Sequence, residues 1–284
     1  MDASGRAELR SMKIRLGTFF LITSVVSPAD GPDPQDIVRR AFLKDADIIN
    51  ASRDYTYLRR RVVTEFGKNG VSKVAKDETD EILVLYGRPY ERQMRRDGKD
   101  LSARDTAREE EKLSKELARR KKGADKTEAR ERKEMDDRRK AIIEVSNAFD
   151  FRLDGVTGPP GRLAWLIDAT PKPGFKPESR AGKIYPKLSG RLWIDQADHR
   201  LVKVEANVNE KISFGWFILQ LLPGAVFKHE RIRLDDAVWL PKRDLAKGEA
   251  KIGGMKTIRA EVETTYSNYR RFQVESTIRQ VSEK

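Results

Sequence analysis

Two pairs of carboxylates are the residues most suited by type and spacing to do chemistry. Asp195 and Asp198 are separated by two residues, and Asp235 and Asp236 are adjacent. Neighbouring carboxylates can work as a general acid and a general base. Both pairs, however, lie between stretches of strand-forming residues, where aspartate accepts local backbone N–H hydrogen bonds in turns. We therefore interpret both pairs as turns.

Histidine and cysteine, the other common catalytic and metal-binding residues, are scarce. The chain has no cysteine, which excludes disulfides, thiol catalysis and cysteine-ligated metal. Its two histidines, His199 and His229, are not at a metal-ligating spacing. No phosphate-binding loop, nucleophile elbow or zinc-protease motif occurs. The sequence thus predicts no metal, no cofactor and no enzymatic activity.

The most apolar stretch after residue 29 is ISFGWFILQLLPGAVF, residues 212–227. It suits a buried strand or helix of the core, or a wall of a lipophilic cavity. The second reading predicts a cavity lined by this stretch and by aromatic and branched residues of the neighbouring strands. The candidates are Trp165, Ile167, Trp193, Val204, Phe214, Trp216, Phe217, Ile218, Phe227 and Trp239.

Short runs rich in aromatic and β-branched residues, separated by Gly, Pro and Asp turns, predict the scaffold, a mainly antiparallel β (α+β) fold. In residues 202–208 the apolar side chains alternate with polar ones, so one sheet face is dry and the other wet; the apolar set is Val202, Val204, Ala206 and Val208, and the polar set is Lys203, Glu205 and Asn207. Residues 36–50 have the apolar spacing of an amphipathic helix. This helix, a second sheet or a ligand must cover the dry face.

A charged segment interrupts the strand pattern. Residues 88–140 contain 20 Lys/Arg and 14 Asp/Glu, few large apolar residues and a breaker, Gly123. This composition predicts a helical insertion at about 97–140, which Gly123 can divide into the two arms of a hairpin. It is either a solvated connection between strands or a basic surface for an anionic partner. The candidates for the second reading are Arg119, Arg120, Lys121 and Lys122.

The N-terminal region has the pattern of an export signal. Residues 12–15 (MKIR) carry two cations, residues 16–26 are an uncharged apolar run, and Ser27, Pro28 and Ala29 suit cleavage after Ala29. A buried helix is the alternative, but the run lacks amphipathic spacing. We expect a signal peptide at 1–29 and a single periplasmic domain at 30–284. Without cleavage, the same run would tether the domain to the inner membrane.

The charge balance narrows the choice of partner. The full chain has 58 Lys+Arg and 45 Asp+Glu, a net charge of +13, and +11 remains without residues 1–29. Such a balance suits an anionic membrane surface or an acidic protein. Export and the lack of a binding motif argue against nucleic acid.

The order of several motifs resembles a known family. GRLWID at 190–195 leads into LVKVE at 201–205, VWLP follows at 238–241, and YSNY at 266–269 precedes Phe272. This order resembles the periplasmic lipoprotein-localisation factors (Lol-type carriers) and their outer-membrane lipoprotein-sorting relatives, over residues 34–90 and 149–275. The resemblance implies an unclosed antiparallel β-barrel or strongly curved sheet, with helices over one face and an apolar cavity for acyl chains. The charged insertion has no counterpart in that family.

The sequence therefore favours a non-enzymatic envelope protein that binds an acyl chain, a lipoprotein or another amphiphile. The alternative is an envelope scaffold or adaptor whose basic insertion docks on an anionic membrane or an acidic protein. A hydrolase of envelope polymers would need a catalytic constellation that we do not find. The sequence does not indicate an oligomeric state.

Overall fold

The structure is a computed structural model that describes residues 31–51, 54–67, 69–122, 124–159, 161–215, 218–234 and 238–271. Internal contacts divide the chain into Met1–Pro32 and Asp33–Lys284, and the description below concerns the second unit. The expected signal peptide at 1–29 lies outside the described residues, as do Trp216, Phe217, Asp235 and Asp236.

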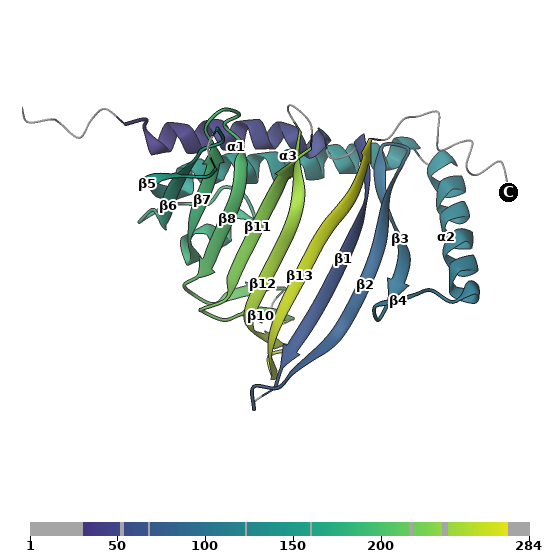
Figure 1. Cartoon of the computed structure of the whole chain (residues 1–284). Coiled ribbons are helices and arrows are strands. Elements are labelled where there is room, and N and C mark those ends of the chain that lie inside the picture. Colours follow the sequence, from purple (N-terminus) through teal and green to yellow (C-terminus); the bar gives the residue numbers. More distant parts are fainter. Residues whose placement is uncertain are drawn as a thin grey trace, which may run out of the picture. The chain divides into compact units, whose positions relative to one another are not determined.

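One large antiparallel sheet makes up most of this unit (Figure 1). Its main path runs β4-β3-β2-β1-β13-β12-β11-β8-β7-β6-β5, so β4 and β5 form the two edges and the sheet is not closed into a barrel. Two short strands lie off this path, since β10 pairs with β12 and β9 pairs with β10. The strands are β1 Tyr55–Phe66, β2 Ser72–Leu85, β3 Arg88–Arg96, β4 Lys99–Asp100, β5 Phe149–Thr157, β6 Ala164–Pro171, β7 Leu188–Asp195, β8 Leu201–Val208, β9 Ile212–Phe214, β10 Leu219–Leu221, β11 Val226–Arg233, β12 Trp239–Ile252 and β13 Lys256–Arg271.

Helices cover one face of the sheet at the β5–β8 end. Helix α1 (Pro34–Ala51) packs its buried residues Ile37, Val38 and Ala41 against strands β6, β7 and β8. Helix α3 (Ala124–Ala148) runs beside α1 and also contacts the 3₁₀-helix η2 (Gly182–Lys187) (Figure 1). Helix α2 (Ala103–Lys122) lies at the other end of the sheet, next to β3. The expected fold, an unclosed antiparallel sheet with helices on one face, is confirmed.

Cross-strand pairing arranges the helix-facing side chains in rows. One row joins Ile167, Leu192 and Val204, and α1 packs directly on it. The adjacent row joins Ala169, Gly190 and Ala206. Directly paired residues of antiparallel strands point to the same face, so these small residues leave room between the sheet and the helices. The second row is the reason that a cavity exists at this place.

Several predicted elements have different limits in the structure. Gly123, the predicted break, lies outside the described residues. Helix α2 ends at Lys122 and α3 begins at Ala124, and α3 continues to Ala148, beyond the predicted end of the insertion at about residue 140, because its last turns pack on the core. Strand β2 is continuous from Ser72 to Leu85. Strand β12 begins at Trp239 and includes Pro241, which is tolerated because the β11–β12 register shifts between Glu230 and Arg231.

Candidate ligand-binding cavity

An apolar cavity lies between the helices and the sheet, with a volume of ≈190 Å³. Its roof includes Phe42 of α1 and Val145 of α3, and Tyr185 of η2 adds a side wall. The floor is the row of small residues together with larger apolar side chains around it. The sheet residues that line the cavity are Phe149, Phe151, Ala169, Leu188, Ser189, Gly190, Leu192, Val204, Glu205 and Ala206.

Tyr185 shows how this wall combines an apolar ring with a satisfied polar atom. Its ring packs beside Phe149, and its hydroxyl donates a hydrogen bond of 2.8 Å to the backbone oxygen of Ala141 in α3. Burial, and then the nearby Glu144 carboxylate, raise the pKa of Tyr185 to about 12. The side chain is therefore a neutral phenol at physiological pH, and it fixes η2 to α3 without placing a charge in the cavity.

A second apolar hollow of ≈310 Å³ adjoins the cavity, since Val204 lines both. Phe227, Ala246 and Val262 form its apolar surface on strands β11, β12 and β13. Phe227 pairs with Ala206, Ala246 pairs with Phe227, and Val262 pairs with Ala246. These three residues therefore continue the row of Ala169, Gly190 and Ala206 on the same face of the sheet. An apolar path thus extends along the sheet beyond the area that α1 covers.

A chain of polar side chains borders this second hollow. Arg231 forms an ion pair of 2.8 Å with Asp45 of α1, and its Nε donates to His229 Nε2 at 3.1 Å. Because Nε2 accepts, Nδ1 carries the imidazole proton, and it lies next to Asp244. Tyr266 completes the chain by donating its hydroxyl hydrogen to Asp244 at 2.6 Å. The four interactions link α1 to the sheet.

Two carboxylates of this chain have opposite pKa shifts. Burial raises the pKa of Asp45 although Arg231 acts against it. Burial also acts to raise the pKa of Asp244, but the hydrogen bonds from His229 and Tyr266 outweigh it and the pKa falls below its usual range. Both groups are engaged with their neighbours, and no nucleophile lies between them. We therefore assign this chain a structural role.

The structure places the cavity candidates in different environments. Val204 and Phe227 line the hollows, whereas Ile167 is fully buried beneath α1 and Trp165 packs at the edge of the same cluster. Trp193 lies on the opposite face of the sheet, where Lys203 Nζ is 4.4 Å from its ring centroid. Side chains alternate along β7, so Leu192 and Trp193 cannot both face the cavity.

Those of the other candidates that the structure describes lie away from the cavity. Trp239 is buried and donates its indole N–H to Asp198 Oδ2 at 3.0 Å. Phe214 and Ile218 are exposed at the β9–β10 hairpin, and Trp216 and Phe217 between them are outside the described residues. Sequence reasoning missed Phe42, Val145 and Tyr185, because only the packing of the helices brings them to the sheet.

The predicted turn at Asp195 and Asp198 is confirmed. Asp195 Oδ1 accepts the backbone N–H of Asp198 at 2.7 Å, closing the turn between β7 and β8. Arg162 binds both carboxylates, with distances of 3.1 Å to Asp195 and 3.0 Å to Asp198. His199 packs its ring against Trp165 at a centroid distance of 5.0 Å. These residues hold one end of the sheet together.

The cationic candidates at the end of α2 also differ from one another. Arg119, Lys121 and Lys122 are exposed, and Arg119 pairs with Glu116. Arg120 is buried, where it donates to the backbone oxygens of Leu85, Arg88 and Pro89 at 2.9–3.1 Å. Arg120 therefore fixes α2 to the β2–β3 hairpin. It is not part of an exposed basic surface, because its guanidinium donates hydrogen bonds to the backbone oxygens of that hairpin.

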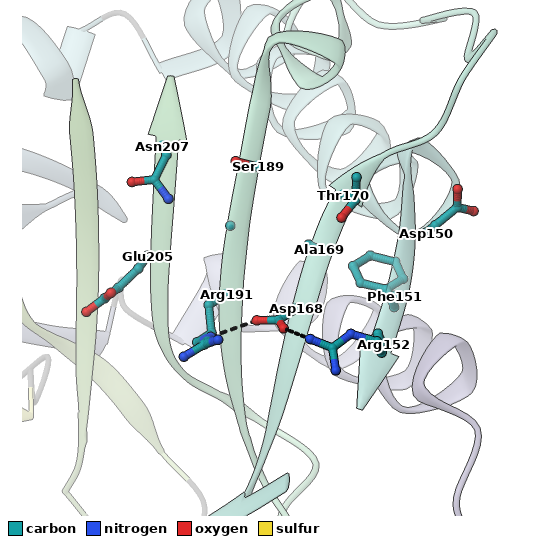
Figure 2. A pocket seen from close by; sticks show the side chains of 11 residues that line it. Asp150, Phe151, Arg152, Asp168, Ala169, Thr170, Ser189, Arg191, Glu205 and Asn207 are labelled. Carbon is teal, nitrogen blue, oxygen red and sulfur yellow. Dashed lines mark hydrogen bonds and ion pairs between the residues drawn. The ribbon is translucent and has the colours of Figure 1, made fainter. Parts of the chain in front are cut away.

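The opposite face of the sheet has a polar hollow of ≈520 Å³ (Figure 2). Figure 2 shows Asp168 between Arg191 and Arg152, bound to both. Ser189, Thr170 and Asn207 lie at its other end (Figure 2). The paired charges explain why this face is wet, and they leave no acid–base pair poised for reaction.

The described residues contain no group of three or more His, Cys, Asp or Glu side chains arranged to hold a metal ion. None of the helices in this part of the chain is both long and apolar enough to span a bilayer.

Comparisons with known proteins give structural neighbours but no sequence family. No family model matches the sequence, and no curated protein does. A LolA superfamily protein from Nitrosomonas europaea is similar with 10% identity and a TM-score of 0.30, over 87% of this chain and 97% of that chain. An outer membrane lipoprotein-sorting protein domain from Vibrio parahaemolyticus is similar with 8% identity and a TM-score of 0.32. A DUF1329 family protein from Desulfovibrio piger is similar with 12% identity and a TM-score of 0.29. Each of these two similarities covers 84% of this chain and 94% of the other chain.

Two of these three structures belong to the lipoprotein-localisation and lipoprotein-sorting group that the sequence resembles.

Proposed function

We propose that this protein is a non-enzymatic carrier of the cell envelope that holds an acyl chain, a lipoprotein or another amphiphile between its helices and its sheet. The observation that carries the proposal is the cavity beneath α1 and α3, whose lining atoms are apolar. Such a cavity favours an apolar guest, because removing apolar surface from water stabilises the complex by about 25 cal/mol per Å². The export signal expected at residues 1–29 supports a periplasmic location.

The size of the cavity limits how the guest is held. Its ≈190 Å³ is less than the roughly 300–1,000 Å³ of typical ligand sites. The adjoining hollow of ≈310 Å³ offers a continuation past Val204 towards Phe227. A long acyl chain would occupy both spaces, and outward movement of α1 or α3 would admit a bulkier one.

A titration with a fluorescent fatty acid tests the proposal. Ala206→Phe places a ring on the cavity floor, and we expect it to weaken binding about tenfold or more, because it fills the space the guest needs. Asn207→Phe puts the same ring on the opposite, exposed face of β8 and should bind as the unmodified chain does. Thermal melts check that both variants fold. No saturable binding by the unmodified chain, or equal binding by both variants, would refute the proposal.

A further inference from the structure

Four large apolar side chains are exposed together at one end of the sheet. Phe214 and Ile218 belong to the β9–β10 hairpin, and Ile252 and Met255 to the β12–β13 turn. Their exposed fractions are 43%, 73%, 44% and 92%. We call these four residues the apolar rim. Single exposed apolar residues are ordinary, but a contiguous group of them marks an interaction surface.

Backbone pairing shows that the rim is one surface. Leu219 pairs with Phe214 on one side and with Ile252 on the other, so the three form a row across β9, β10 and β12. The N–H of Gly253 donates to the oxygen of Ile218 at 3.1 Å, which joins the two turns. Gly253 and Gly254 have φ values of 59° and 76°, and this left-handed backbone makes the tight turn that presents Met255.

Apolar residues connect the rim with the cavity. Leu221 pairs with Ile212, which lies in a buried cluster with Val208 and Ala225. Leu188 packs against that cluster and also lines the cavity, and Phe227 packs against it and lines the adjoining hollow. The helix-facing side of the sheet thus carries apolar side chains from the cavity to the rim. In Figure 1 the β12–β13 turn lies at the ends of the strands away from α1.

The charges around the rim indicate what it meets. Lys256 pairs with Ile252 and therefore shares its face, whereas Lys251, the preceding residue of β12, points to the opposite face at the same end of the sheet. Within the described part of the chain these two lysines have no ion-pair partner, whereas the nearby Arg259 is paired with Glu249 at 2.5 Å. Exposed apolar side chains flanked by amines fit a bilayer with anionic headgroups: the apolar groups enter the headgroup–acyl boundary and the amines contact phosphates.

We propose that the apolar rim docks on an anionic lipid bilayer. The role of this docking rests on the proposed carrier function, because a docked rim would give an acyl chain an apolar route into the cavity. The docking itself requires only the rim and the two lysines.

Flotation of the full chain with vesicles tests the docking. With equimolar phosphatidylglycerol and phosphatidylcholine, the unmodified chain should float with the vesicles. The double variant Ile218→Ser with Met255→Ser should bind at least about tenfold more weakly, because two apolar side chains no longer enter the bilayer. Lys251→Gln with Lys256→Gln should lose about ten- to thirtyfold on anionic vesicles, with little change on pure phosphatidylcholine.

Two matched controls make the result specific. Val156→Ser alters an apolar side chain that is 51% exposed on the edge strand β5, and Lys121→Gln with Lys122→Gln removes two cations from α2. Both should float as the unmodified chain does. Failure of the unmodified chain to float, wild-type flotation of the rim variants, or loss only in the α2 variant would overturn the docking proposal. The fatty-acid titration without vesicles tests the carrier function separately. In that titration the rim variants should bind the fatty acid as the unmodified chain does.

Discussion

Replacement of Ile167 by alanine tests the packing that holds α1 on the sheet. Ile167 is fully buried in the middle of β6, and it lies in one cluster with Ile37, Val38 and Ala41 of α1. The substitution removes three carbon atoms from this interface. Because the surrounding backbone is fixed on both sides, by the helix and by the pairing of β6 with β5 and β7, the space cannot close fully.

The expected loss follows from these contacts. Three buried carbons account for about 2.4 kcal/mol at about 0.8 kcal/mol each, and the remaining cavity brings the loss in the free energy of unfolding to about 3–4 kcal/mol. For a structured unit of this size, the melting temperature should fall by roughly 6–15 °C.

Urea unfolding followed by circular dichroism, together with thermal melts, measures this loss. Leu163→Ala is the control, because Leu163 is 42% exposed just before the same strand and should change stability by no more than about 0.5 kcal/mol. A loss below about 1 kcal/mol for Ile167→Ala would refute the reasoning, since it would mean that α1 does not pack on β6 as described.

The remaining predictions concern α2. Arg120→Met should speed amide exchange across residues 103–122 about tenfold or more, because it removes the hydrogen bonds to the β2–β3 hairpin. The control variant Lys121→Met should leave the exchange rates unchanged. Equal protection of α2 in the two variants would contradict the assigned role of Arg120. The hydrogen bonds from Arg119 and Arg120 lower the pKa of Glu116 from its ordinary 4.5 to about 2. Glu116 should therefore stabilise the docked α2 above pH 4.5, and this contribution should be lost as the pH falls towards 2. Amide protection factors, which are corrected for the intrinsic pH dependence of exchange, should fall between pH 5 and pH 2.5, and Glu116→Gln should reduce this fall. An unchanged pH dependence of protection in that variant would be contrary to this assignment.

Local patterns predicted much of the fold. Alternation in residues 202–208 correctly divided Val204 and Ala206 from Lys203 and Glu205, because side chains of a strand alternate between its faces whatever it pairs with. The amphipathic spacing of residues 36–50 likewise predicted α1. Both patterns depend only on residues close together in the chain, so they can be recognised in a single sequence.

The candidate cavity was less accessible to sequence reasoning. Its floor is Ala169, Gly190 and Ala206, small residues that become one row only through the register of three strands. Trp193 was chosen for its size, but its position in β7 places it on the far side from Leu192. Arg120 looked like part of a basic run, and only the fold shows that the β2–β3 hairpin surrounds its guanidinium. Register and long-range packing, which no local pattern encodes, decided all three.

Extraction of the purified full chain with organic solvent, followed by mass spectrometry, tests the central claim most directly. Binding of an amphiphile beneath α1 and α3 predicts recovery of acylated molecules in a fixed ratio to the protein. The Ala206→Phe variant, prepared in the same way, should yield markedly less. A chain that is reproducibly free of such molecules, or an equal yield from that variant, would contradict the claim that this cavity holds the ligand.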